Sequence, residues 1–265
     1  MQGDGWVSYV FNIPFHGNVR LKRVMDNVKA DVRLRTFWRC SNVMAIERMG
    51  FTDHGPTHVK IVANLSLKLL RILVARDVKP SIVKDYGMVN EDAEVVVVLG
   101  SIFHDLGMVV IRNDHEKYGV ILAREFIERC CAPVYSEEER AIICSEVLHA
   151  IVAHERPNEP LTVEAGIVGI ADALDMEAGR ARIPFQSGKV DIHAVSALSI
   201  EKVEVVEGGT KPITIKIKMS DSAGVFQIDE LLKPRIEISG LRDYFHVVAE
   251  ITGDRETRII EKFEI

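Results

Sequence analysis

The chain has 265 residues, 47% hydrophobic content and a formal net charge of −6. That is enough apolar material for one large domain or two smaller ones, and the acidic balance does not favour a dedicated nucleic-acid-binding protein. No apolar run reaches the roughly 20 residues of a membrane-spanning helix, so we expect no membrane segment. The chain starts with no signal-like segment and its four cysteines form no CxxC pair. We therefore expect a cytoplasmic protein with reduced thiols.

Up to about residue 185 the sequence predicts helices, because apolar residues recur at intervals of three and four. Ser136 and Glu139 form a capping box, which marks the start of one of these helices. The valines at residues 95–98 would also suit a strand. The predicted helices cover residues 18–50, 56–75, 90–107, 114–131, 136–156 and 162–179.

After residue 185 the pattern changes to that of strands. Ile213, Ile215 and Ile217 alternate with polar residues, which is typical of a strand with one buried face. The predicted strands are residues 201–208, 211–220, 244–251 and 258–265, with a short helix at residues 228–240. We therefore expect a mainly α helical bundle at residues 1–185. A small α+β domain with antiparallel strands should follow at residues 186–265, and we expect it either to mediate homodimerisation or to shape the entrance of the pocket.

Most of the nine histidines lie in the helical part, near the ends of predicted helices: His54, His58, His104, His115, His149 and His154. His104 is followed directly by Asp105 in the stretch IFHDLG, and Asp172 lies inside the apolar run IVGIADALDM. A buried carboxylate is costly unless it is paired or binds a metal ion. Imidazole nitrogens and carboxylate oxygens together suit Mn, Fe, Zn, Ni or Co.

A neighbouring histidine and aspartate can serve two ions at once. The histidine coordinates the first ion, while the two oxygens of the carboxylate bridge to the second. A two-metal site generates hydroxide near neutral pH and stabilises the oxygens of an in-line displacement at phosphorus. The residues therefore favour phosphate chemistry with one or two divalent transition-metal ions per chain.

The order His58, His104-Asp105, Asp172 resembles the HD superfamily of metal-dependent phosphohydrolases over roughly residues 54–182. The segments HVKIVANLSL, FHDLG, HEKYGVILAREF, AHERP and IADALDM are each similar to a motif of that superfamily. The resemblance implies a first metal ion held by His58, His104, Asp105 and Asp172. It also implies that Asp105 bridges to a second ion bound by His115 and His154, with His104 and Asp105 at the catalytic centre. The C-terminal half is similar to an uncharacterised archaeal-type group of HD proteins, which implies no substrate.

Two differences from the superfamily narrow the activity and the set of metal ligands that the resemblance implies. Met108 stands where relatives that open cyclic dinucleotides have lysine, and no Gly-Tyr-Pro tripeptide follows the late histidines, so that activity is not implied. His149 is an alternative metal ligand, but five residues of helix rotate by about 500° and turn it roughly 140° away from His154. Both side chains reach one ion only if the helix ends before His154, which Pro157 would allow.

Candidate substrate-binding residues lie close to these motifs. A planar guanidinium group matches the oxygens of a phosphate, and surface ion pairing is the competing interpretation for each arginine. Asp175 either orients a ligand histidine or is a solvated helix residue. The residues proposed to hold the substrate are His54, Arg156, Arg180 and Arg182.

We therefore expect an enzyme that hydrolyses a phosphate monoester or phosphodiester in a small phosphorylated substrate, a nucleotide. One alternative is a nucleotide-sensing or partner-binding protein whose metal site does not turn over. Another is a nucleic-acid-acting hydrolase that uses the basic residues of segment 20–39. We interpret that segment as a solvated face of an amphipathic helix.

Overall fold

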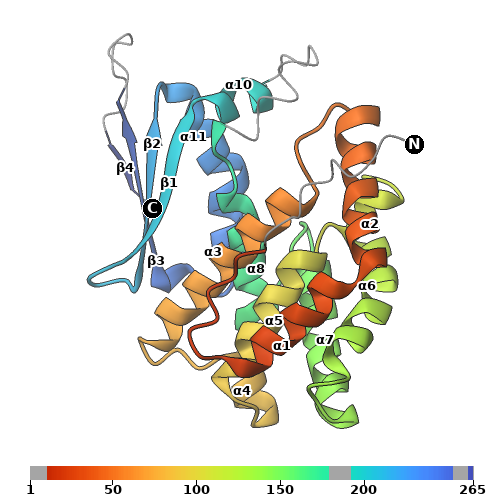
Figure 1. Ribbon diagram of the computed structural model, residues 1–265. Helices are drawn as coiled ribbons and strands as arrows, with labels where there is room; N and C mark the ends of the chain where they lie inside the picture. Colours follow the sequence, from red (N-terminus) through yellow and green to blue (C-terminus); the bar gives the residue numbers. More distant parts are fainter. Residues whose placement is uncertain (1–10, 179–191, 253–261, 265) are drawn as a thin grey trace.

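The computed structural model describes residues 11–178, 192–252 and 262–264 of the chain (Figure 1). A helical part comes first and a small sheet follows, which confirms the predicted fold class. The helical part consists of α1 (Val19–Ala30), α2 (Val32–Asn42), the π-helix η1 (Val43–Arg48), α3 (Pro56–Val74), α4 (Ser81–Tyr86), α5 (Asn90–Phe103), the 3-10 helix η2 (Leu106–Val109), α6 (His115–Cys131), α7 (Glu137–Ala153) and α8 (Val163–Leu174). The C-terminal part consists of α10 (Ile192–Leu198), β1 (Ile200–Glu207), β2 (Ile213–Met219), η3 (Ser222–Gly224), α11 (Val225–Gln227), η4 (Ile228–Leu232), α12 (Lys233–Ile238), η5 (Arg242–Tyr244), β3 (Phe245–Ile251) and β4 (Lys262–Glu264).

Helices are present in each range predicted for the first part, with 18–50 divided into α1, α2 and η1 and 90–107 into α5 and η2. The capping box forms as expected: the Ser136 hydroxyl accepts the Glu139 N–H, and the Glu139 carboxylate accepts the Ser136 N–H. The valines at residues 95–98 are helical although isolated β-branched residues favour strands. All residues from 95 to 103 are buried, so burial on every side outweighs their intrinsic preference.

Helix α5 is the centre of the bundle and contacts α1, α3, α7 and α8. Gly100 allows two of these neighbours to approach closely, because a Cβ there would stand 3.1 Å from the Ala150 Cβ and 3.2 Å from the Val168 Cγ2. The Trp38 indole N–H donates to the Ile102 carbonyl over 3.1 Å, which satisfies one carbonyl in the last turn of α5. The helix end that carries His104 is therefore fixed from several sides.

The sheet has the strand order β1-β2-β3-β4. The predicted antiparallel pairing is correct for β1 with β2 and for β3 with β4, but β2 and β3 run parallel. Parallel neighbours need a crossover connection. The segment from η3 to η5 supplies it and contains the predicted short helix.

The crossover brings the C-terminal part directly onto the helical bundle, where α12 and η4 contact α8. A Cβ at Gly166 of α8 would stand 2.8 Å from the Ser239 carbonyl oxygen, so the absence of a side chain permits this contact. The predicted domain boundary at residue 185 lies outside the described residues and stays a prediction.

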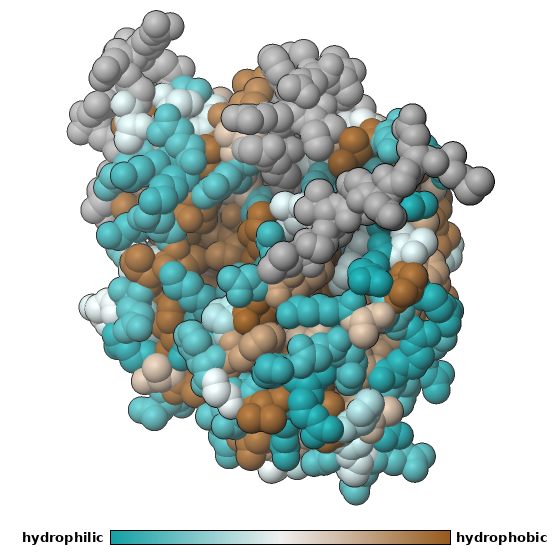
Figure 2. All heavy atoms as spheres, viewed as in Figure 1, coloured by the Kyte–Doolittle hydropathy of each residue, from teal (hydrophilic) through white to brown (hydrophobic). Residues whose placement is uncertain are grey.

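Within the described part of the chain, none of the helices combines the length and the apolar character that crossing a membrane requires. Hydrophilic residues predominate on the face seen in Figure 2, with smaller hydrophobic areas between them.

A buried polar network ties α1 to α5 and to the loop before α7. The Asp92 side chain is 1% exposed; its oxygens accept from an Arg20 guanidinium nitrogen at 2.7 and 2.8 Å. It also accepts from the Tyr135 hydroxyl at 2.9 Å and the Val89 N–H at 3.2 Å. Replacing Asp92 with alanine should lower the free energy of unfolding by about 3 kcal/mol, because it leaves these donors without their buried acceptor. Urea denaturation measures the change.

Asp26 provides the matched control, because its pair with Lys22 lies on the surface of α1. Replacing Asp26 with alanine should change the free energy of unfolding by less than about 0.5 kcal/mol. Equal losses in the two variants would contradict a stabilising role for the buried network.

Candidate metal centre

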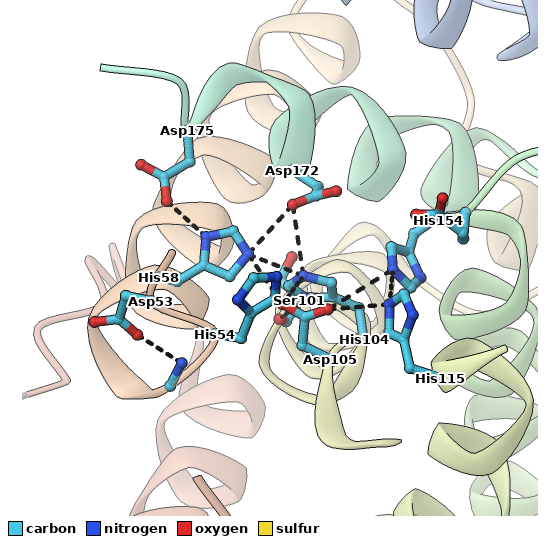
Figure 3. A network of polar contacts seen from close by, with 12 residues as sticks. Asp53, His54, His58, Ser101, His104, Asp105, His115, His154, Asp172 and Asp175 are labelled. Atoms are coloured by element: carbon cyan, nitrogen blue, oxygen red, sulfur yellow. Dashed lines mark hydrogen bonds and ion pairs between the residues drawn. The ribbon is translucent and has the colours of Figure 1, made fainter. Parts of the chain in front are cut away.

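Side chains from five helices converge where several helix ends meet (Figure 3). One comes from the first turn of α3 and two adjacent ones from the end of α5. The others come from the start of α6, the end of α7 and the last turn of α8. In that order the residues are His58, His104 with Asp105, His115, His154 and Asp172.

The first group of ligand atoms lies between α3, α5 and α8. The Nε2 atom of His58 stands 3.1 Å from the Nε2 atom of His104 and 3.3 Å from the Asp105 Oδ2. The Asp172 Oδ1 lies 3.2 Å from the His58 Nε2 and 3.6 Å from the His104 Nε2. These four side chains therefore surround one small space.

The second group lies on the other side of Asp105. The Asp105 Oδ1 stands 3.2 Å from the His115 Nε2 and 4.0 Å from the His154 Nε2, and these two nitrogens are 3.1 Å apart. The Oδ2 atom of the same carboxylate faces the first group. Asp105 thus presents one oxygen to each group of histidines.

The backbone fixes the tautomers of three of these histidines. The Nδ1–H of His104 donates to the Ser101 carbonyl over 2.7 Å, and the Nδ1–H of His154 donates to the Ile151 carbonyl over 2.6 Å. His115 makes the corresponding bond to the Arg112 carbonyl over 3.0 Å. A neutral imidazole carries only one N–H, so each Nε2 in this arrangement presents a lone pair. In the neutral form of these rings, which is the form that binds a metal ion, the nitrogens that face one another are therefore acceptors.

Such an arrangement fits a divalent transition-metal ion. Two nitrogens that each lie about 2.0–2.1 Å from one ion stand roughly 3 Å apart, as the paired Nε2 atoms do. The Asp105 Oδ2 is buried and accepts no hydrogen bond from any described residue. Three overlapping sets of residues could hold an ion: His58, His104 and Asp105; His104, His154 and Asp172; and Asp105, His115 and His154.

Two further side chains border the first group. The Nδ1–H of His58 donates to the Asp175 carboxylate over 2.6 Å. Asp175 therefore orients the imidazole of a ligand candidate, which was the first of the two interpretations of this residue. His54 is 7% exposed, and its ring centroid lies 5.9 Å from that of His58. Its Nδ1–H donates to the Thr52 carbonyl over 2.8 Å, which keeps the ring beside the cluster (Figure 3).

The cluster concentrates negative charge in a buried place. Burial opposes ionisation of Asp105 and Asp172, but the surrounding imidazoles hold the pKa of both carboxyl groups well below its ordinary value. Burial likewise opposes the charged form of His104, yet the two carboxylates raise its pKa to about 9. Burial and the nearby His104 and His115 lower the pKa of His154 well below its ordinary value. The carboxylates are therefore ionised and stabilise positive charge between them.

An open cleft of about 350 Å³ lies beside the second group, and His115 is the one member of that group among its lining residues. Its lining includes the basic residues Arg112, Lys117 and Arg156. The guanidinium group of Arg156 donates to the Glu230 carbonyl over 3.2 Å. Arg156 therefore lies beside the cluster and also contacts the C-terminal part.

Three other residues predicted for the site are not among the side chains described above. His149 is not brought into the cluster: its Nε2 accepts the Leu161 N–H over 2.9 Å. This contact corrects the prediction that His149 is a metal ligand. Helix α7 extends to Ala153 and His154 keeps helical backbone angles, so the two histidines point in different directions. Arg180 and Arg182 lie outside the described residues.

The sequence interpretation missed two residues of the site. One is Gly107: a Cβ there would collide with the His115 carbonyl oxygen, so its small size lets η2 contact α6. Arg235 of α12 lies with one nitrogen 3.9 Å from the Asp172 Oδ2 and 3.3 Å from a Glu155 oxygen. The glycine directly after FHDL was a signal for the first residue, whereas no local pattern indicated the second.

Comparison with known proteins shows sequence similarity over the segment that holds the cluster. The family model of the HD domain matches residues 57–177. The chain is 41% identical over 244 residues to the uncharacterized protein MJ1020 of Methanocaldococcus jannaschii, covering 92% of this chain and 93% of that protein. It is also 25% identical over 179 residues to ribonuclease Y of the Aster yellows witches'-broom phytoplasma, covering 63% of this chain and 30% of that protein. Ribonuclease Y of the Onion yellows phytoplasma gives a similar match, 25% over 180 residues. With a cluster that fits metal ions inside the matched segment, this chain belongs to the HD domain family, within the superfamily of metal-dependent phosphohydrolases.

Proposed function

We propose that this protein hydrolyses a phosphate monoester or phosphodiester of a nucleotide. The observation that carries the proposal is the position of Asp105, whose two oxygens each face a separate pair of imidazole Nε2 atoms. A carboxylate between two sets of nitrogen ligands is the arrangement that a two-metal phosphohydrolase needs.

The proposed ligands follow from the two groups. His58, His104, Asp105 and Asp172 would hold one ion, since their ligand atoms lie within 3.6 Å of a neighbour in the group. Asp105, His115 and His154 would hold the other. Imidazole and carboxylate ligands suit Mn, Fe, Zn, Ni or Co.

When bound, such ions supply an acidified water as nucleophile and positive charge that offsets the charge at phosphorus. The protein's own residues keep the centre in order: backbone carbonyls hold the histidine tautomers, and Asp175 fixes the ring of His58. The basic residues of the cleft, Arg112, Lys117 and Arg156, would hold the non-bridging phosphate oxygens. His54, beside the first group, would contact the substrate from the α3 side.

Two observations favour a nucleotide over a nucleic acid as substrate. The cleft volume of about 350 Å³ is in the range of small-molecule sites. Basic residues of segment 20–39 are engaged within the protein: Arg20 pairs with Asp92, Lys22 with Asp26 and Arg33 with Glu125. RNA phosphodiesters are the second candidate, which the similarity to the ribonuclease Y proteins supports.

Metal analysis and activity assays on protein purified without chelator test the proposal. We expect two transition-metal ions per chain, hydrolysis of nucleotides, loss of activity on chelation and its return with Mn, Co, Ni, Fe or Zn. Tight nucleotide binding without turnover under every metal would instead identify a sensor. Preferred cleavage of RNA, with binding that weakens steeply as salt rises, would favour the second candidate.

We also propose that the protein is a cytoplasmic homodimer. The four cysteines are free, which is typical of a reducing compartment. Strand β1 is at an edge of the sheet that the described residues form, and an edge strand is a position at which a second copy can dock. Size-exclusion chromatography with light scattering on the full chain should give twice the mass of 29.7 kDa, and a monomer would contradict the proposal.

A further inference from the structure

An arginine from the C-terminal part reaches the metal centre of the helical part. Arg235 belongs to α12, and its side chain is only 11% exposed. Its Nη2 atom lies 3.3 Å from a Glu155 oxygen and 3.9 Å from the Asp172 Oδ2. The other oxygen of Asp172 faces His58 and His104. A single carboxylate thus separates the guanidinium group from the first group of metal-ligand candidates.

The hydrogen-bonding capacity of this guanidinium group is not used up by the protein. The Nη1 atom is buried and donates to no acceptor among the described residues. A stabilising buried ion pair is normally bidentate with short bonds, since a buried charge without hydrogen bonds is costly. Here the Glu155 contact is long for a hydrogen bond and the Asp172 contact is longer still. A structural ion pair between the two parts of the chain does not account for this geometry.

Packing holds Arg235 in this position. The next residue, Ile236, is 2% exposed, and α12 contacts α8, which carries Asp172. The close approach of Ser239 to Gly166 fixes the end of α12 against the same helix. The arginine therefore lies on a rigid element with its donors already directed, as a binding residue requires.

Glu155 connects the arginine with the cleft. This residue lines the cleft, and its carboxylate contacts the guanidinium group. The neighbouring Arg156 also lines the cleft and donates to the Glu230 carbonyl of η4, in the same crossover segment as Arg235. The crossover segment thus contacts two residues that line the cleft, Glu155 and Arg156.

We propose that Arg235 binds the phosphate group of the substrate at the metal centre, so that the C-terminal part completes the active site. The inference rests on the proposed function and names its phosphate-binding residue. The ligand class is a phosphate ester dianion, or inorganic phosphate as the product. The planar fork of the guanidinium group gives two parallel hydrogen bonds to adjacent phosphate oxygens, with Nη1 as one of the donors.

Binding of inorganic phosphate to the metal-loaded full chain tests this inference by calorimetry. The Arg235→Met variant keeps a flexible, unbranched side chain, which is shorter than arginine, and removes its donors. We expect its Kd for phosphate to rise about tenfold to hundredfold, the effect of losing hydrogen bonds to a charged group. The exposed Arg242, in η5 of the same part, supplies the matched control. The Arg242→Met variant should bind phosphate as the wild type does, and both variants should keep the wild-type metal content.

Two results would overturn the inference: an unchanged Kd in Arg235→Met, or a loss of metal that accounts for the weaker phosphate binding. If that variant does not fold, Arg235→Lys replaces it, because lysine keeps the charge and loses the planar fork. Wild-type phosphate affinity in Arg235→Lys would then exclude a role for the fork, and weakened affinity with metal retained would support it.

Hydrolysis by the wild type is measured in parallel. Phosphate binding that depends on Arg235 without any hydrolysis would overturn the proposed function and leave the phosphate site standing. Hydrolysis together with phosphate binding that does not depend on Arg235 would overturn the role of Arg235 and leave the proposed function standing.

Discussion

Replacing Asp105 with alanine is expected to lower the rate of hydrolysis by at least about a thousandfold, since both groups of ligands share this carboxylate. The same variant should bind fewer than two ions per chain, because it loses one oxygen ligand from each group. Initial rates under saturating metal and elemental analysis of the dialysed protein measure the two effects. Both should change together.

Asp229 provides the control for this variant, because it forms an exposed pair with Lys233 on the crossover segment. Its replacement with alanine should leave the rate and the metal content at the wild-type values. An Asp105→Ala protein that retains two ions per chain and the wild-type rate would refute the central role of this carboxylate.

Replacing His154 with alanine is expected to remove one ion per chain and to lower the turnover number by about 10²-fold to 10³-fold. The reason is that the Nε2 atoms of His154 and His115 face the Asp105 Oδ1, whereas His58, His104 and Asp172 lie at the other oxygen. The metal content measured by elemental analysis should therefore fall from two ions per chain to one. The remaining ion should be the one held between α3, α5 and α8.

His149 is a suitable control because it is a histidine of α7 whose side chain points away from the cluster. Its Nε2 accepts the Leu161 N–H, so the His149→Ala variant should keep both ions and its activity. Loss of an ion in His149→Ala, with none lost in His154→Ala, would reverse the ligand assignment made from the structure.

Much of the site is predictable because its residues depend on where helices begin and end. The capping box at Ser136 is read from adjacent residues and defines where α7 begins, and His154 directly follows the last residue of this helix. The angle between His149 and His154 follows from helix geometry, and the helical backbone at His154 decides which one joins the cluster. Local rules were sufficient for these features.

The features that were missed depend on contacts between distant segments. The parallel pairing of β2 and β3 requires a crossover whose path no single stretch of sequence specifies. Arg235 lies in a segment that predicted only a short helix, and its role depends on how α12 packs against α8. The valines of α5 were ambiguous for the same reason, because burial from neighbouring helices decided their conformation.

The contact at Gly107 has a consequence for which ions the centre accepts. Main chain touches main chain there, because a side chain on Gly107 would collide with the His115 carbonyl and with the Gly119 nitrogen. The contact therefore fixes the backbone that follows Asp105 against the first turn of α6, which carries His115. Larger cations in a two-metal centre would need a greater separation between these two residues, so we expect this backbone contact to disfavour them.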